Sequence, residues 1–175
     1  MIKRIITIIL VVLILVIQIS FLSNFEFWRP KLNLIIILLT FLLLTAGYQQ
    51  ALIWGLISGY LLDYYSAWPF GLITFSLITS IFIVYLIGQH YLTNRSLTTF
   101  VLLVGAFTLS FYLFLIIGHF LLSLFALGNL SSLASLAVSG LWQILFNCLI
   151  GLVSFLIYTF ATNRFQRNFL VKGNL

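Results

Sequence analysis

Long uncharged stretches dominate the chain, and polar residues lie between them. Residues 5–25 and residues 32–62 contain no charged side chain. A membrane-spanning helix needs about 20 mostly apolar residues, so the first stretch predicts one span at about residues 5–22. The second stretch is too long for one ordinary span, and the polar interruption Ala46–Gln50 divides it. It therefore predicts two short, closely packed helices.

The remaining apolar stretches complete a plan of six helices. The fourth begins after the turn at Pro69–Gly71, and the fifth ends at the turn residues Gly128 and Asn129. We therefore predict an all-α integral membrane protein, a six-transmembrane-helix bundle in which residues 1–175 form a single polytopic domain. The expected spans are about 5–22, 31–47, 50–63, 71–90, 97–127 and 136–161.

The composition excludes the other broad classes of protein. Charged residues make up 6% of the chain and hydrophobic residues 63%, and the mean hydropathy is +1.27. An average soluble domain has about 25% charged residues, so this chain could not cover a soluble surface. One cysteine excludes an intramolecular disulfide framework. The net charge of +6 does not indicate a nucleic-acid partner, because no folded polar surface is available to carry a basic patch.

The basic residues instead predict how the chain is oriented in the cell membrane. With six spans, both termini lie on one side, and cytoplasmic segments collect Lys and Arg. Arg29 and Lys31 fall on the opposite side. Six basic residues on the first side against these two predict cytoplasmic N- and C-termini; the six are Lys3, Arg4, Arg95, Arg164, Arg167 and Lys172.

A stripe of small residues is the most informative local pattern. Ala51, Gly55, Gly59 and Asp63 are spaced by four, so they share one face of a helix. Two glycines at this spacing allow the backbone of another helix to approach closely. The stripe therefore predicts a tight helix contact with an acid at its outer end. Ordinary helix packing, with a solvated carboxylate, explains the same pattern.

Few residues could carry chemistry. Asp63 is the one acid next to a span, and an ionisable group at membrane depth is a candidate functional residue. We expect its carboxylate to accept hydrogen bonds from backbone N–H groups of the following turn or from His119. Gln143 and Asn147 share one face of the sixth helix, where they indicate either helix packing or a substrate pocket. No spacing suits a metal, and no cofactor motif or catalytic constellation is present.

Two segments resemble the family of rod-shape-determining protein MreD. They are "RPKLNLIIILLTFLLL", from Arg29 to Leu44, and "GLISGYLLDYYSAWPFG", from Gly55 to Gly71. That family has a proline entering a hydrophobic helix, then a G-x-x-x-G-x-x-x-D segment, then a glycine before the next span. The residues that match, and that the resemblance marks for helix packing or partner binding, are Arg29, Pro30, Gly55, Gly59, Asp63 and Gly71.

The resemblance implies a role rather than a reaction. Proteins of this family are non-catalytic membrane scaffolds of the bacterial cell-elongation complex, which supports peptidoglycan synthesis and cell shape. The implied partner is the bitopic protein MreC and, through it, MreB, RodA and a class B penicillin-binding protein. The family is also similar in fold to the substrate-binding subunits of energy-coupling-factor transporters.

Two other functions were considered beside the scaffold role. A small-molecule-binding membrane subunit of a transporter is the alternative function. An intramembrane enzyme is disfavoured, because no nucleophile, base and orienting group are placed to act together. The bilayer itself is a partner on any reading, and the sequence leaves a homo-oligomer open.

Overall fold

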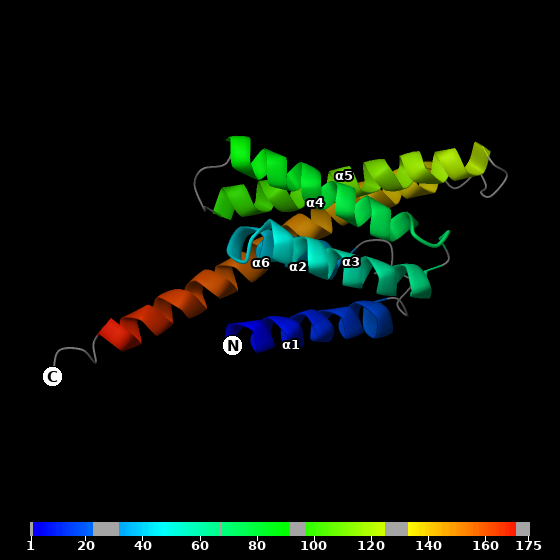
Figure 1. Cartoon of the computed structure of the whole chain (residues 1–175). Coiled ribbons are helices and arrows are strands. Elements are labelled where there is room, and N and C mark those ends of the chain that lie inside the picture. Colours follow the sequence, from blue (N-terminus) through cyan, green and yellow to red (C-terminus); the bar gives the residue numbers. More distant parts are fainter. Residues whose placement is uncertain (1, 23–31, 67, 92–96, 125–132, 171–175) are drawn as a thin grey trace.

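The computed structural model describes residues 2–22, 32–66, 68–91, 97–124 and 133–170, which form six α-helices and one π-helical segment (Figure 1). Side chains are described for 8–20, 32–66, 68–89, 97–123 and 138–160. The helices are α1 (Ile2–Val16), which continues into the π-helix η1 (Ile17–Leu22), α2 (Leu34–Thr45), α3 (Tyr48–Tyr65), α4 (Leu72–Tyr91), α5 (Leu97–Leu124) and α6 (Leu133–Leu170).

Helix α2 lies at the centre of the bundle. It contacts α1, α3, α4, α5 and α6, while α3, α4 and α5 each pack against the next helix along the chain. Seven of its twelve residues are buried, and Ile35, Ile36 and Leu39 are almost completely so. A helix that is apolar on every side is typical of a buried position. The core then continues outward through Leu77 of α4 and Phe107 of α5.

Two glycines set the hairpins that begin and end α3. Gly47 has a φ of 92° and separates α2 from α3, and Gly71 has a φ of 91° just before α4. These values lie in the left-handed region that glycine adopts without steric cost. The backbone N–H of Leu72 donates to the carbonyl oxygen of Pro69 (3.2 Å), which closes a turn with Gly71 at its third position. The predicted breaks near Gly47 and Gly71 are therefore confirmed.

Several helix boundaries differ from the prediction. The first predicted segment, 5–22, is not one α-helix, because η1 replaces it from Ile17. The second begins at Leu34 rather than 31, since Asn33 caps it. The third, 50–63, is longer at both ends. The fourth is displaced by one residue, and of the fifth, 97–127, residues 125–127 lie outside the described part of the chain.

Helix α6 is much longer than the membrane span that was expected within it. The sixth segment was expected at 136–161, but α6 runs from Leu133 to Leu170. The expected end rested on the polar residues after Ala161, which mark where a span ends. Nothing there stops a helix, since residues 161–170 contain neither Gly nor Pro. The helix consequently extends well past the other helices (Figure 1).

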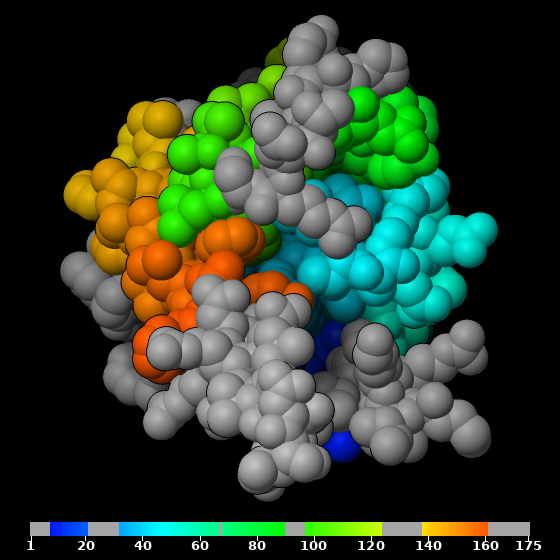
Figure 2. Space-filling model, turned by 90° about the vertical axis from the view of Figure 1, so that its left-hand side faces the viewer, coloured from blue at the N-terminus to red at the C-terminus, as the bar shows by residue number. Residues whose placement is uncertain are grey.

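Within the described residues, three helices are long and apolar enough to cross a membrane. Their apolar stretches are Leu72–Gln89 in α4, Leu97–Ser123 in α5 and Val138–Phe160 in α6. The first two helices carry shorter apolar stretches, Ile8–Ser20 and Leu34–Thr45. Figure 2 looks onto the end of the bundle that carries the α2–α3 turn. In this view α2 and α3 (cyan) lie on the right and α6 (orange) lies on the left. The architecture is that of a helical membrane protein.

Candidate functional site

The small-residue stripe of α3 faces α4. Its members Ala51, Gly55, Gly59 and Asp63 are all buried. A Cβ atom added to Gly59 would lie 2.8 Å from the Cα atom of Thr74, closer than real atoms approach. A Cβ atom added to Gly55 would instead collide with the terminal methyl of Ile81. The close helix approach that the spacing predicts is therefore present, and at Gly59 it is an approach to backbone.

The carboxylate of Asp63 is buried, with 3% of the residue exposed, and it accepts three hydrogen bonds from α4. The backbone N–H of Ile73 donates to Oδ1 (2.9 Å), and that of Thr74 donates to Oδ2 (3.0 Å). The hydroxyl of Thr74 also donates to Oδ2. Backbone donors thus satisfy Asp63 as expected, but they belong to the first turn of the next helix.

This arrangement accounts for every backbone donor at the start of α4. The first four N–H groups of an α-helix have no partner inside the helix. Leu72 donates to the carbonyl of Pro69, and Phe75 donates to that of Gly71 (2.9 Å). Ile73 and Thr74 donate to Asp63. A carboxylate here also interacts favourably with the helix dipole, so Asp63 serves as an N-cap supplied by the preceding helix.

The loop between α3 and α4 is held by hydrogen bonds to the end of α3 and by a ring contact with α5. The hydroxyl of Ser66 donates to the carbonyl of Asp63 (3.1 Å) and accepts from the backbone N–H of Trp68 (3.3 Å). The ring of Trp68 meets His119 of α5 edge-on, with 5.0 Å between ring centroids. His119 was the alternative donor expected for Asp63, and in the structure its ring lies against Trp68. The loop is thereby fixed to α5 as well as to α4.

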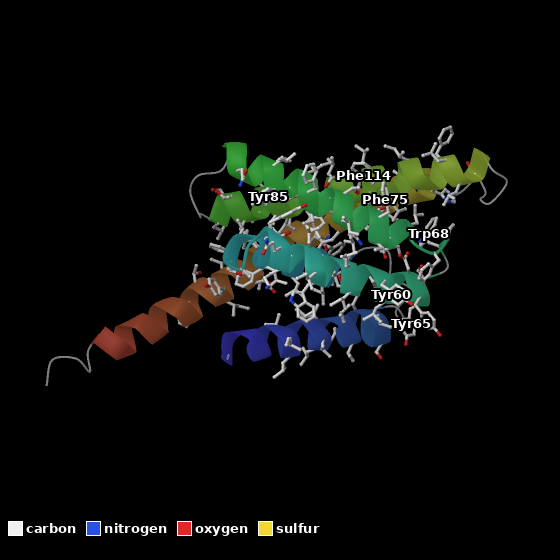
Figure 3. All side chains as sticks on the ribbon, viewed as in Figure 1. Tyr60, Tyr65, Trp68, Phe75, Tyr85 and Phe114 are labelled. Atoms are coloured by element: carbon white, nitrogen blue, oxygen red, sulfur yellow. The ribbon has the colours of Figure 1, made fainter. Side chains whose placement is uncertain are left out.

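Aromatic side chains mark the two ends of α3 and α4. Tyr60, Tyr65 and Trp68 lie at the end that carries the Asp63 cap, and Tyr85 lies at the other end (Figure 3). Tyr85 stacks on Tyr48 at the start of α3, with 4.5 Å between centroids. Tyr60 and Tyr65 are more than half exposed. Tyr48 and Tyr85 are half-buried. Aromatic residues at both ends of a helix pair are typical of the two membrane–water interfaces.

A second capped helix start lies where α2 begins, inside the bundle. Asn147 of α6 is fully buried, and its Oδ1 accepts from the backbone N–H of Asn33 (3.0 Å). Its Nδ2 donates to the hydroxyl of Thr108 in α5 (3.2 Å). Gln18 of η1 accepts from the N–H of Leu34 (3.0 Å) and donates to the carbonyl of Leu32 (3.3 Å).

Asn33 completes this cap with its own side chain, whose Oδ1 accepts from the N–H of Ile35 (3.1 Å). The N–H groups of Asn33, Leu34 and Ile35 thus each donate to a side-chain acceptor, supplied by α6, by η1 and by Asn33 itself. Asn147 hydrogen-bonds to other helices as the sequence indicated. Gln143, its neighbour one turn away, is also buried, and its Oε1 has no hydrogen-bond partner among the described residues.

The candidate residues fall into two groups. Gly55, Gly59, Asp63 and Gly71 come together in the α3–α4 hairpin. Arg29 and Pro30 lie outside the described residues. Sequence reasoning missed Gln18, Asn33 and Thr74 as partners in the caps. An asparagine before an apolar helix is a recognised capping signal, whereas the role of Thr74 depends on how α3 and α4 meet.

The chemistry available at these sites is capping and packing. The carboxylate of Asp63 and the amide of Asn147 are both used by backbone donors. In the part of the chain that the structure describes, no three His, Cys, Asp or Glu side chains are grouped to hold a metal ion. Both sites therefore fix the positions of helices relative to one another.

Comparison with known proteins gives one match. The family model described as rod shape-determining protein MreD matches residues 1–164 of the 175-residue chain. No curated protein and no solved structure matches the chain.

Proposed function

Since the chain belongs to the MreD family of rod shape-determining proteins, we propose that it is a non-catalytic scaffold subunit of the bacterial cell-elongation complex. Family membership gives it a role in cell shape and identifies it as a membrane protein. The finer proposal is that it binds MreC and in this way supports peptidoglycan synthesis at the membrane.

This proposal rests on how Asp63, the one acid among the described residues, is hydrogen-bonded. The carboxylate of Asp63 caps α4, and its three hydrogen bonds all come from that helix; the loop beyond it contacts α5 through Trp68. A catalytic or ligand-binding carboxylate would be directed to an open site instead. A rigid outer hairpin without a reactive group is suited to presenting a surface to another protein.

Within this proposal, the candidate residues act by shaping the hairpin. Gly55 and Gly59 allow α3 to approach α4, Asp63 fixes the start of α4, and Gly71 permits the turn between them. Arg29 and Pro30 are proposed as part of the same partner surface on the strength of the family pattern. MreB, RodA and a class B penicillin-binding protein would be reached indirectly, through MreC.

The proposed architecture is a single domain over residues 1–175 with six spans and a fold similar to the substrate-binding subunits of energy-coupling-factor transporters. Both termini would lie in the cytoplasm. The distribution of Lys and Arg supports this orientation, because cytoplasmic segments are enriched in these residues. Helices α1 and α2 are short for spans, and the polar caps at the start of α2 support their placement within the bundle.

Affinity purification of the tagged full-length chain from native membranes tests the proposal. MreC should be recovered in a defined ratio, and an Asp63→Leu variant expressed at the same level should recover less of it. Recovery of an ATPase module with a bound small molecule, and no MreC, would support the transporter alternative and overturn the scaffold proposal.

A further inference from the structure

Gln143 of α6 is a buried amide whose oxygen accepts no hydrogen bond from the described residues. Only 5% of the residue is exposed, and its Oε1 has no partner. Two other amides near the start of α2, those of Gln18 and Asn147, use both their oxygen and their nitrogen atoms. Burying a polar atom without a hydrogen bond is costly, and nearly all such atoms in proteins have a partner. Gln143 therefore needs a donor.

The position of Gln143 is fixed by the contacts on either side of it along α6. Gly140, Gln143 and Asn147 share one face of this helix, because they are spaced by three and four. A Cβ atom added to Gly140 would lie 2.9 Å from the ring of Tyr112 in α5. Asn147 donates to the hydroxyl of Thr108, one turn earlier in α5. Gln143 therefore faces α5 between Tyr112 and Thr108, beside the start of α2 to which Asn147 is bonded.

The serine and threonine hydroxyl groups of this part of α5 are already engaged. Thr108 donates to the carbonyl oxygen of Val104 (2.8 Å). Ser110 donates to the carbonyl oxygen of Ala106 (2.8 Å). Backbone N–H groups inside a helix are bonded to the carbonyl four residues earlier. None of these donors is available to Gln143.

Water is the donor that fits these surroundings. It is neutral, so it can lie in a bundle whose core contains Phe107, Phe111 and Leu115 without burying a charge. It is also small, whereas a lipid headgroup or a side chain of another protein could reach a residue that is 5% exposed only by separating the helices. Buried waters typically make about two to four hydrogen bonds to polar groups that would otherwise be unpaired.

We propose that a water molecule is bound between α5 and α6, where it donates one hydrogen bond to Oε1 of Gln143 and the other to Oδ1 of Asn147. An amide oxygen has two lone pairs, and Oδ1 of Asn147 accepts one described bond, from Asn33. Residues four apart on a helix have Cβ atoms about 5–6 Å apart, which two hydrogen bonds of about 2.8 Å through one oxygen can span. Because Asn147 also bonds to the start of α2, the water ties the α5–α6 contact to that helix. The site forms in the isolated chain, whether or not a partner protein is bound.

Radiolytic labelling with heavy-oxygen water tests the proposal on the purified full-length chain in detergent micelles. An X-ray pulse generates a hydroxyl radical from a bound water, the radical adds oxygen to side chains next to it, and mass spectrometry measures the oxygen added. Tyr112 is the reporter, and Gln143→Met removes the amide while keeping a side chain of similar length. The controls are Phe100, an almost fully buried ring elsewhere in α5, and Ser110→Ala, which removes a buried hydroxyl bonded within α5.

Tyr112 should be labelled in the native chain and should lose most of its label in Gln143→Met, while Phe100 stays unlabelled and Ser110→Ala leaves the label at Tyr112 unchanged. Gln143→Met should also lower the midpoint of unfolding in denaturing detergent, because it removes an amide that is hydrogen-bonded. Equal labelling of Tyr112 in both proteins, or no labelling in either, would overturn the proposal. A raised midpoint would overturn it too, since the amide would then be unpaired in the isolated chain. Gln143→Leu serves in the same two measurements if Gln143→Met does not fold.

Discussion

Three glycines of the bundle predict three different responses to the same substitution by alanine. At Gly59 the added Cβ would lie 2.8 Å from the Cα of Thr74, which is backbone. At Gly55 it would meet the end of the Ile81 side chain, and at Gly88 it would meet nothing within 4 Å. The substitution adds one methyl group in each case, so the difference in stability measures the surroundings alone.

The change in the free energy of unfolding depends on whether the atoms that meet the added Cβ can move away. Carbon atoms in contact lie about 3.5–4.0 Å apart, so Gly59→Ala forces α4 away by about 1 Å. That movement also strains the hydrogen bonds from Thr74 to Asp63. Overpacking typically costs about 1–3 kcal/mol, while replacing Gly by Ala inside a helix returns up to about 1 kcal/mol. We expect Gly59→Ala to destabilise the protein by about 1–2 kcal/mol.

The two other variants serve as matched controls. Because a side chain can rotate away, Gly55→Ala should change the free energy of unfolding by less than about 1 kcal/mol in either direction. Gly88→Ala should be neutral or stabilising by up to about 1 kcal/mol. Unfolding is followed by circular dichroism in mixed micelles as the fraction of denaturing detergent rises. If Gly59→Ala were as stable as Gly88→Ala, the close backbone contact between α3 and α4 would be refuted.

Three further predictions concern the caps and the topology. Asp63→Leu leaves two N–H groups of α4 without an acceptor and should cost about 2–4 kcal/mol in the same unfolding assay. Asp63→Asn should retain part of the stability and part of the ability to restore cell shape. Equal damage from both variants would show that the negative charge itself matters. Asn147→Leu should cost about 1–3 kcal/mol by removing the acceptor at the start of α2, and an unchanged midpoint would exclude that cap. In a Cys148→Ser background, a membrane-impermeant thiol reagent added to intact cells should label Trp68→Cys and not Arg95→Cys, whereas labelling of Arg95→Cys would contradict the proposed six-span topology.

The features that could be predicted from the sequence were those that depend on the spacing of residues within one helix or turn. Ala51, Gly55, Gly59 and Asp63 recur every four residues, so their common face follows from helix geometry. The breaks at Gly47 and Gly71 follow from the conformational freedom of glycine and are confirmed by their positive φ values. An acid at the end of such a stripe must find donors, and it does.

Features that depend on helices meeting in space were not predictable in the same way. The spacing does not reveal that the donors to Asp63 come from the start of α4, nor that Gln18 and Asn147 reach the start of α2 from two different helices. Hydropathy located the end of the apolar stretch near Ala161 but not the end of α6 at Leu170, since a helix does not need an apolar environment to continue. The π-helical segment after Val16 has no local signal that we identify.

Direct binding between the purified chain and purified MreC tests the central claim of a scaffold. The full-length chain is placed in lipid nanodiscs, fluorescently labelled MreC is titrated, and binding is followed by anisotropy. We predict saturable binding to the chain, weaker binding to Asp63→Leu because the outer hairpin loses its shape, and none to empty nanodiscs. Absence of saturable binding by a chain that is folded, as judged by the unfolding assay, would contradict the account.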